Sequence, residues 1–140
     1  INNEYEHQIQ IEKIEKLEKL YKDKLQKLNE IREKTTPLIK SIRAKPQTKN
    51  TPIVFMEQVI IDNDHINKNF ISSVVGKNEE LNKQVQESII GGEKNLFIIK
   101  HNGAIDKDSE ATVDGIHFND LGFQRYAKHF IKNIRKLSIL

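Results

Sequence analysis

Residues 106–130 read DKDSEATVDGIHFNDLGFQRYAKHF and carry the most informative pattern in the chain. Asp114 stands three residues before His117, and Gly115 between them lets the backbone turn so that both side chains face one way. A carboxylate that accepts from one ring nitrogen fixes the tautomer of an imidazole and stabilises its protonated form. The pattern indicates half of a hydrolytic triad, or alternatively a loop histidine bonded to Asp114 for structure alone.

The residues after this pair predict a helix that anchors the loop. Asn119 or Asp120 can cap its first turn. Apolar residues then recur at helical spacing: Leu121, Phe123, Tyr126, Ala127, Phe130, Ile131 and Ile134. We therefore expect the Asp–His loop to be fixed at its C-terminal end by a rigid element.

The block from Glu110 to Phe123 resembles the last conserved block of the SGNH (GDSL-like) serine hydrolases. It is most similar to a bacterial branch in which the block reads roughly D-G-x-H-P-x-D-L-G-F, with Phe118 here in place of the usual proline. The resemblance covers about residues 30–135 and implies that Asp114 and His117 are two triad members. It also implies a flavodoxin-like, three-layer α/β fold with parallel strands, of which this chain holds the C-terminal part.

Three other blocks of that family do not occur in these 140 residues. They are the G-D-S-like motif with the nucleophilic serine, and the blocks whose Gly and Asn supply the oxyanion hole. The serines of this chain lack the sharp strand-to-helix turn that exposes a nucleophile. Because each oxyanion donor contributes on the order of 10²–10³ in rate, we expect the chain alone to be inactive. We expect the N-terminal half of the domain to lie outside these residues.

Two apolar runs predict neighbouring parallel strands. Thr51–Ile60 begins with an apolar, β-branched stretch, and residues 95–100 form a second short strand. Residues 77–90 between them predict an amphipathic helix that ends at Gly91-Gly92. The polar loop after the second strand then brings the Asp–His pair to the carboxyl edge of the sheet.

Loops at the carboxyl ends of parallel strands form the ligand crevice of open α/β sheets. Residues 58–70 are therefore expected to line a substrate cleft, with Glu57, Asn63 and His65 as candidate contacts. The run from Asp62 to His65 also has ligand types that suit a divalent ion. No matching spacing surrounds it, so a solvated loop is the simpler interpretation, and no metal or organic cofactor is predicted.

A long amphipathic helix without Gly or Pro is predicted over about residues 4–34. Its apolar residues follow a heptad seam interrupted by Lys24: Ile14, Leu17, Tyr21, Leu28 and Ile31, widened by Ile11, Leu20 and Leu25. We favour packing on its own domain over a coiled coil that self-associates through residues 4–34. Thr36-Pro37 either starts a new helix or lies inside a continuous one. We divide the chain into this helix, residues 1–34, and a partial α/β domain, residues 35–140.

Composition narrows the choice of function. Lysines are interspersed with nearly as many acids, giving a net charge of +3, which indicates a solvated surface and argues against nucleic-acid binding. No apolar run approaches about 18 residues, so no membrane span is predicted. There are no cysteines, which removes disulfides and thiol catalysis. No compartment is predicted.

Two hypotheses of different class remain. The first is the C-terminal half of a serine ester hydrolase, whose substrate by family analogy is an O-acyl ester of a carbohydrate or a small carboxylic ester. The second is a truncated, non-enzymatic relative in which the long helix mediates assembly.

Overall fold

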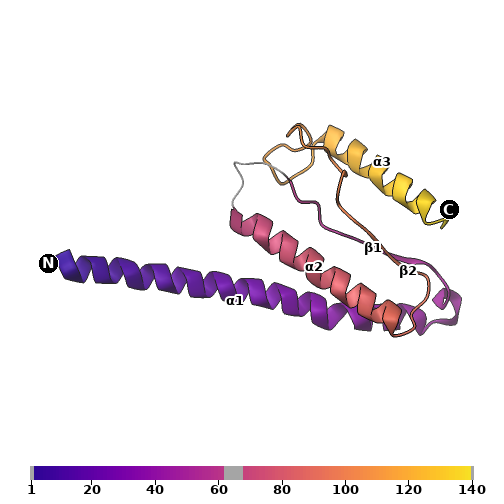
Figure 1. Cartoon of the computed structure of the whole chain (residues 1–140), viewed down its shortest axis with the longest axis horizontal. Helices are drawn as coiled ribbons and strands as arrows, with labels where there is room; N and C mark the ends of the chain where they lie inside the picture. The colour runs from indigo at the N-terminus through magenta and orange to yellow at the C-terminus, as the bar shows by residue number, and fades with distance from the viewer. Residues whose placement is uncertain (1, 62–67, 140) are drawn as a thin grey trace.

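The computed structural model describes residues 2–61 and 68–139. Its elements in chain order are α1 (Asn2–Arg43), the short 3-10 helix η1 (Pro46–Thr48), β1 (Ile53–Met56), α2 (Lys68–Ile90), β2 (Leu96–Ile99) and α3 (Asp120–Lys136). The two strands are parallel neighbours, with Ile53 opposite Leu96. They lie between α1 and α2 on one side and α3 on the other (Figure 1). The predicted α/β class with parallel strands and a long N-terminal helix is confirmed.

The main core lies between the sheet and the first two helices. Ile39 of α1, Val85 of α2 and Leu96 of β2 are buried together. Alternate strand residues complete this layer because side chains of a strand point to opposite faces in turn. These are the partly buried Ile53, Phe55 and Ile98.

A second, smaller core lies under α3 and the loop that precedes it. Ile61, Ala104, Ile105 and Ala111 are buried there, with Val59, Phe118 and Tyr126 packed against them. The Tyr126 hydroxyl also lies 3.6 Å from the Met56 sulfur of β1. This cluster connects the loop after β2 to the sheet on the face opposite α1 and α2.

Helix α1 extends further than the sequence pattern predicts. It runs through Pro37 to Arg43, so Thr36 does not cap a separate helix. Proline removes one backbone donor from a helix interior. Thr35 and Ile39, two residues before and two residues after the proline, are both buried, and this packing holds the chain helical across the missing hydrogen bond. The division of the chain at residue 34 therefore falls inside a continuous helix and stays a prediction.

Helices α1 and α2 lie side by side and run in the same direction (Figure 1). Lys24 donates to the Ser72 hydroxyl at 3.2 Å, and Arg32 donates to both carboxylate oxygens of Glu80, so paired residues are 48 apart in each case. Gly76 lies between these contacts, where an added Cβ would be 3.6 Å from Leu28. Gly76 therefore lies inside the interface between the two helices. Helix α2 itself begins at Lys68, nine residues before the predicted start.

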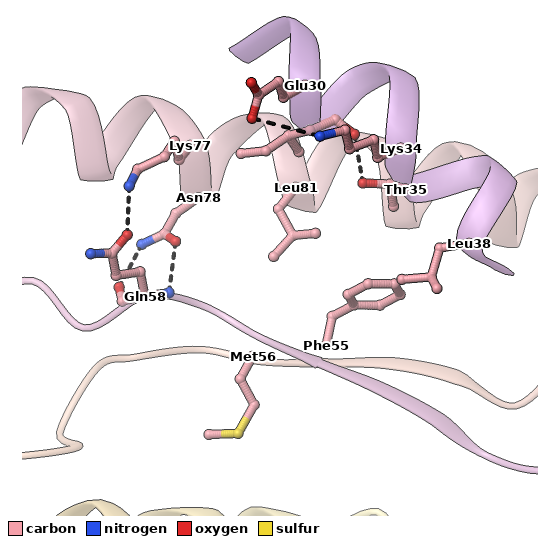
Figure 2. A pocket seen from close by; sticks show the side chains of 11 residues that line it. Glu30, Lys34, Thr35, Leu38, Phe55, Met56, Gln58, Lys77, Asn78 and Leu81 are labelled. Carbon is pink, nitrogen blue, oxygen red and sulfur yellow. Dashed lines mark hydrogen bonds and ion pairs between the residues drawn. The ribbon is translucent and has the colours of Figure 1, made fainter. Parts of the chain in front are cut away.

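Strand β1 occupies the apolar beginning of residues 51–60, as predicted, and it ends because an α2 side chain binds the backbone of Gln58. Gln58 donates its backbone N–H to the Asn78 side chain at 2.9 Å and accepts from the same amide at 2.8 Å (Figure 2). Both backbone groups of Gln58 are therefore bound to α2, and the strand ladder ends at this point.

An open groove of about 540 Å³ lies where α1, α2 and β1 meet. Leu38, Phe55 and Leu81 point into it, and Lys77 bonds the Gln58 amide oxygen at its rim (Figure 2). All four apolar residues of β1 are only partly buried. Within residues 2–61 and 68–139 the sheet has two strands, so β1 has one unpaired edge.

We predict that Ile39→Ala lowers the free energy of unfolding by about 2–5 kcal/mol because the side chain is fully buried at the helix–sheet contact. Leu38 is adjacent in sequence but 50% exposed, so Leu38→Ala is the matched control and should cost much less. Denaturant unfolding followed by circular dichroism measures both. Equal losses in the two variants would contradict this account of the core.

Candidate active site

The loop that carries Asp114 and His117 is a narrow hairpin closed by backbone bonds. Thr112 and Phe118 form an antiparallel bridge. The Val113 N–H donates to the His117 carbonyl at 2.9 Å. Gly115 at the tip has φ +86°, a backbone conformation that glycine adopts without strain. The two candidate side chains are consequently held on one short, ordered turn.

The Asp114 carboxylate organises this turn. One oxygen accepts from the backbone N–H groups of Ile116 and His117 at 2.9 and 2.8 Å, and the other lies 2.6 Å from His117 Nδ1. The backbone bond from His117, its ring and the Ile116 N–H together hold the pKa of Asp114 far below its ordinary value. The carboxylate is therefore ionised and can only accept, so Nδ1 carries the proton and Nε2 is the basic nitrogen.

Both side chains face each other, as their spacing predicts, and both are accessible to solvent. The His117 side chain is 76% exposed and that of Asp114 is 51% exposed. An imidazole whose Nδ1 is fixed by a carboxylate and whose Nε2 is open can accept a proton from a third group. The hairpin thus presents an oriented base on the surface.

Asn119 joins the hairpin to α3. Its side-chain oxygen accepts from Gly122 N–H at 2.9 Å, which makes it the N-cap, and its amide donates to the Glu110 carbonyl at 2.6 Å. Gly122 packs directly on the hairpin, because a Cβ at this position would lie 2.1 Å from the Ala111 carbonyl oxygen. The first turn of α3 and the base of the hairpin therefore form one unit.

Arg125 of α3 fixes the loop between β2 and the hairpin. Its guanidinium donates to both Asp108 carboxylate oxygens at 2.7 Å and to the Ile105 carbonyl at 2.9 Å, and lies 3.3 Å from Asp106. The Arg125 bond lowers the pKa of Asp108 to about 2. The loop is held against α3 before it reaches Glu110.

Glu57, a predicted cleft residue, is buried at the carboxyl end of β1. Its carboxylate accepts from the His101 N–H at 3.0 Å and from the Asn82 amide at 2.5 Å, and lies 3.2 Å from the Lys100 ammonium. Burial alone would raise the pKa of Glu57, but these donors outweigh it and the pKa is lowered. Glu57 thus ties together the ends of both strands and α2.

The other two predicted cleft residues, Asn63 and His65, lie outside the described residues, as does the Asp62–His65 run. Among the described residues there is no group of three or more His, Asp or Glu side chains placed to hold a metal ion. In the same part of the chain, no helix is long and apolar enough to cross a membrane.

Comparison with known proteins identifies the family of this chain. The family model described as "GDSL-like Lipase/Acylhydrolase family" matches residues 17–135. The chain belongs to the GDSL-like lipase/acylhydrolase family. The resemblance seen in the Asp–His block is thereby confirmed, and the match starts earlier in α1 than that block suggested.

A solved structure supports membership of the GDSL-like family. It is the 1.40 Å crystal structure of a Bacteroides ovatus protein that its name assigns to the GDSL-like lipases, with 33% sequence identity and a TM-score of 0.71. The similarity covers 78% of this chain and 32% of the other, so the chain spans about a third of that protein's length. A search of curated proteins finds no match.

Sequence reasoning found the Asp–His pair of this GDSL-like chain but missed the residues that hold it. Arg125 and Asp108 are 17 residues apart and belong to no local pattern. Gly122 falls within the recognised DLGF motif, yet only the 2.1 Å approach to Ala111 explains why a glycine is needed there. The reach of Asn119 back to Glu110 likewise depends on the hairpin geometry.

We predict that Gly122→Ala displaces the hairpin of this GDSL-like chain from α3, because the new methyl group would overlap the Ala111 carbonyl oxygen. Amide hydrogen exchange should then accelerate at Asn119 and Val113, whose N–H groups close the hairpin. Gly76→Ala is the matched control, since its Cβ has room at 3.6 Å and alanine favours the helix interior by up to about 1 kcal/mol. Unchanged exchange in Gly122→Ala would contradict the packing described.

We predict a pH dependence for the Arg125 contact. The pKa of Asp108 is depressed from 3.8 to about 2, so the stabilisation is complete above pH 3.8 and is lost as pH falls through about 2. Arg125→Gln should return the Asp108 pKa toward 3.8, whereas Lys128→Gln, which removes the same charge from the same helix, should leave it near 2. Carboxyl carbon NMR titration measures the value. A depressed pKa that survives in Arg125→Gln would rule out this guanidinium as its cause.

Proposed function

We propose that this chain supplies the acid and the base of a Ser–His–Asp ester hydrolase. The observation that carries the proposal is the 2.6 Å contact between Asp114 and His117 Nδ1, which leaves Nε2 open to solvent. Family membership supports the reaction class, because GDSL-like lipases and acylhydrolases act on acyl esters.

In the proposed reaction, His117 Nε2 takes the proton of a serine hydroxyl while the serine oxygen attacks the ester carbonyl. The resulting imidazolium then gives this proton to the departing alcohol, which leaves an acyl-serine. Water attacks the acyl-serine, His117 takes a proton from the water, and the proton returns to the serine as the acid is released. Asp114 stays ionised throughout because its backbone donors hold its pKa low.

The nucleophilic serine and the oxyanion donors are proposed to come from outside residues 1–140. Two observations support this. The family's G-D-S-like block does not occur in the sequence, and the chain spans about a third of the related crystal structure. The high exposure of His117 is consistent with a base whose serine partner approaches from another part of the protein.

The proposed substrate is an O-acyl ester, either of a carbohydrate or of a small carboxylic acid, and this choice rests on family analogy. No metal or organic cofactor is required by the chemistry proposed. Glu57, Asn63 and His65 are kept as proposed cleft contacts. For Glu57 the structure suggests an indirect contribution, since both of its carboxylate oxygens already bind the chain.

We predict that, in a protein joining this chain to the serine-bearing part of its domain, His117→Ala lowers kcat for p-nitrophenyl acetate by at least about 10³. Asp114→Asn should lower kcat by up to about 10⁴, because the amide can donate to Nδ1 and favours the wrong tautomer. His7→Ala is the matched control, since His7 is exposed on α1. Steady-state kinetics measures all three.

Full turnover in His117→Ala would remove this residue from the mechanism. A complete, folded protein with no esterase activity toward acetyl, butyryl and acetylated-sugar substrates would favour the non-enzymatic alternative instead.

A further inference from the structure

One apolar stripe runs along most of α1, and only part of it is covered. Toward the C-terminal end the stripe contains Leu28, the buried Thr35 and the buried Ile39, which pack toward α2 and the sheet. Toward the N-terminal end it continues at the same spacing of three or four residues. These residues are 36–69% exposed: Ile11, Ile14, Leu17, Tyr21 and Leu25.

The change from covered to exposed occurs near the start of α2. Residues of α1 and α2 that touch are 48 apart, so the first residue of α2, Lys68, lies level with residue 20 of α1. Residues 2–19 of α1 extend past that point and project from the body of the molecule (Figure 1). We call residues 4–25 the arm. Its apolar face is a direct continuation of the α1–α2 interface.

Part of this face lies outside the family domain. The family match begins at residue 17, so Ile11 and Ile14 have no counterpart in the family model, whereas Leu17 and the exposed residues after it lie within the match. The groove at the meeting of α1, α2 and β1 lies instead next to residues 30–38 of α1. Both unpaired edges of the two-stranded sheet that the described residues form belong to strands that pack near Ile39, so further strands would be added toward the other end of the helix.

The charges of the arm favour a second copy of the arm as its partner over a lipid surface. Helices that lie on membranes have polar faces rich in Lys and Arg. The arm is balanced, with six acids and five lysines interspersed: Glu4, Glu6, Glu12, Glu15, Glu18 and Asp23 against Lys13, Lys16, Lys19, Lys22 and Lys24. Two such arms carry both signs along their length and meet without net repulsion.

We propose that the arm binds the arm of a second copy of this chain. The contact is a helix pair in which Ile14, Leu17 and Tyr21 of each copy cover the apolar face of the other. A two-fold axis makes such a contact self-complementary, because the same surface serves both partners. Residues spaced three and four apart provide the seam that paired helices require.

Sedimentation equilibrium of the 140-residue chain tests the proposal. The expected mass is twice the 16.3 kDa of one chain. The double variant Ile14→Glu/Leu17→Glu places charges in the seam and should sediment as a single chain, with its helix content unchanged by circular dichroism. Ile90→Glu is the matched control, because Ile90 is 84% exposed at the far end of α2 and its replacement should leave the mass at twice that of one chain.

A cross-linking measurement locates the contact independently. The chain has no cysteine, so single-cysteine variants report one position each. Leu17→Cys should form disulfide-linked pairs on mild oxidation at a rate at least tenfold above that of Ile90→Cys. Sedimentation as a single chain in the unsubstituted protein would overturn the proposal. So would association that persists in the double variant, or equal cross-linking at the two positions.

Discussion

The ionised carboxylate of Asp114 is the group on which the geometry of the site depends. It accepts two backbone donors with one oxygen and the imidazole with the other, so a single side chain sets both the shape of the turn and the orientation of the base. Hydrogen bonds to a charged acceptor are roughly twice as strong as neutral ones. The exposure of the pair therefore does not imply disorder of the ring, because His117 is held through its backbone as well as its side chain.

The rest of the fold brings this turn to the edge of the sheet. Glu57 binds the backbone at the end of β2, Arg125 binds the loop that follows, and Asn119 joins the hairpin to α3. Each clamp acts on a successive part of the same loop. The segment from the end of β2 to the start of α3 is thus held at three successive points. The small core around Ala111 packs against the same segment.

The sequence predicted those parts of the structure that depend on local patterns. The two strand segments, the cap at Asn119 and the facing of Asp114 and His117 each follow from residues close together in the chain, and the helix between the strands predicted that they pair in parallel. It did not predict the extents of α1 and α2, because Pro37 and Gly76 usually interrupt helices and here are held by tertiary packing. The Arg125 and Glu57 clamps join residues 17 or more apart, and no periodicity reports such contacts. The sequence pattern also did not show which residues of α1 contact α2, because it did not locate the start of α2.

The hydrogen bonds that shape the hairpin all lie within residues 105–125. These local bonds orient the two proposed triad members, Asp114 and His117, relative to each other. Fixing reacting groups in place is a large share of what enzymes contribute, because translational and rotational freedom is lost before the chemical step. If the proposed reaction holds, this freedom remains to be lost only when the serine approaches, since Asp114 and His117 are already fixed relative to each other.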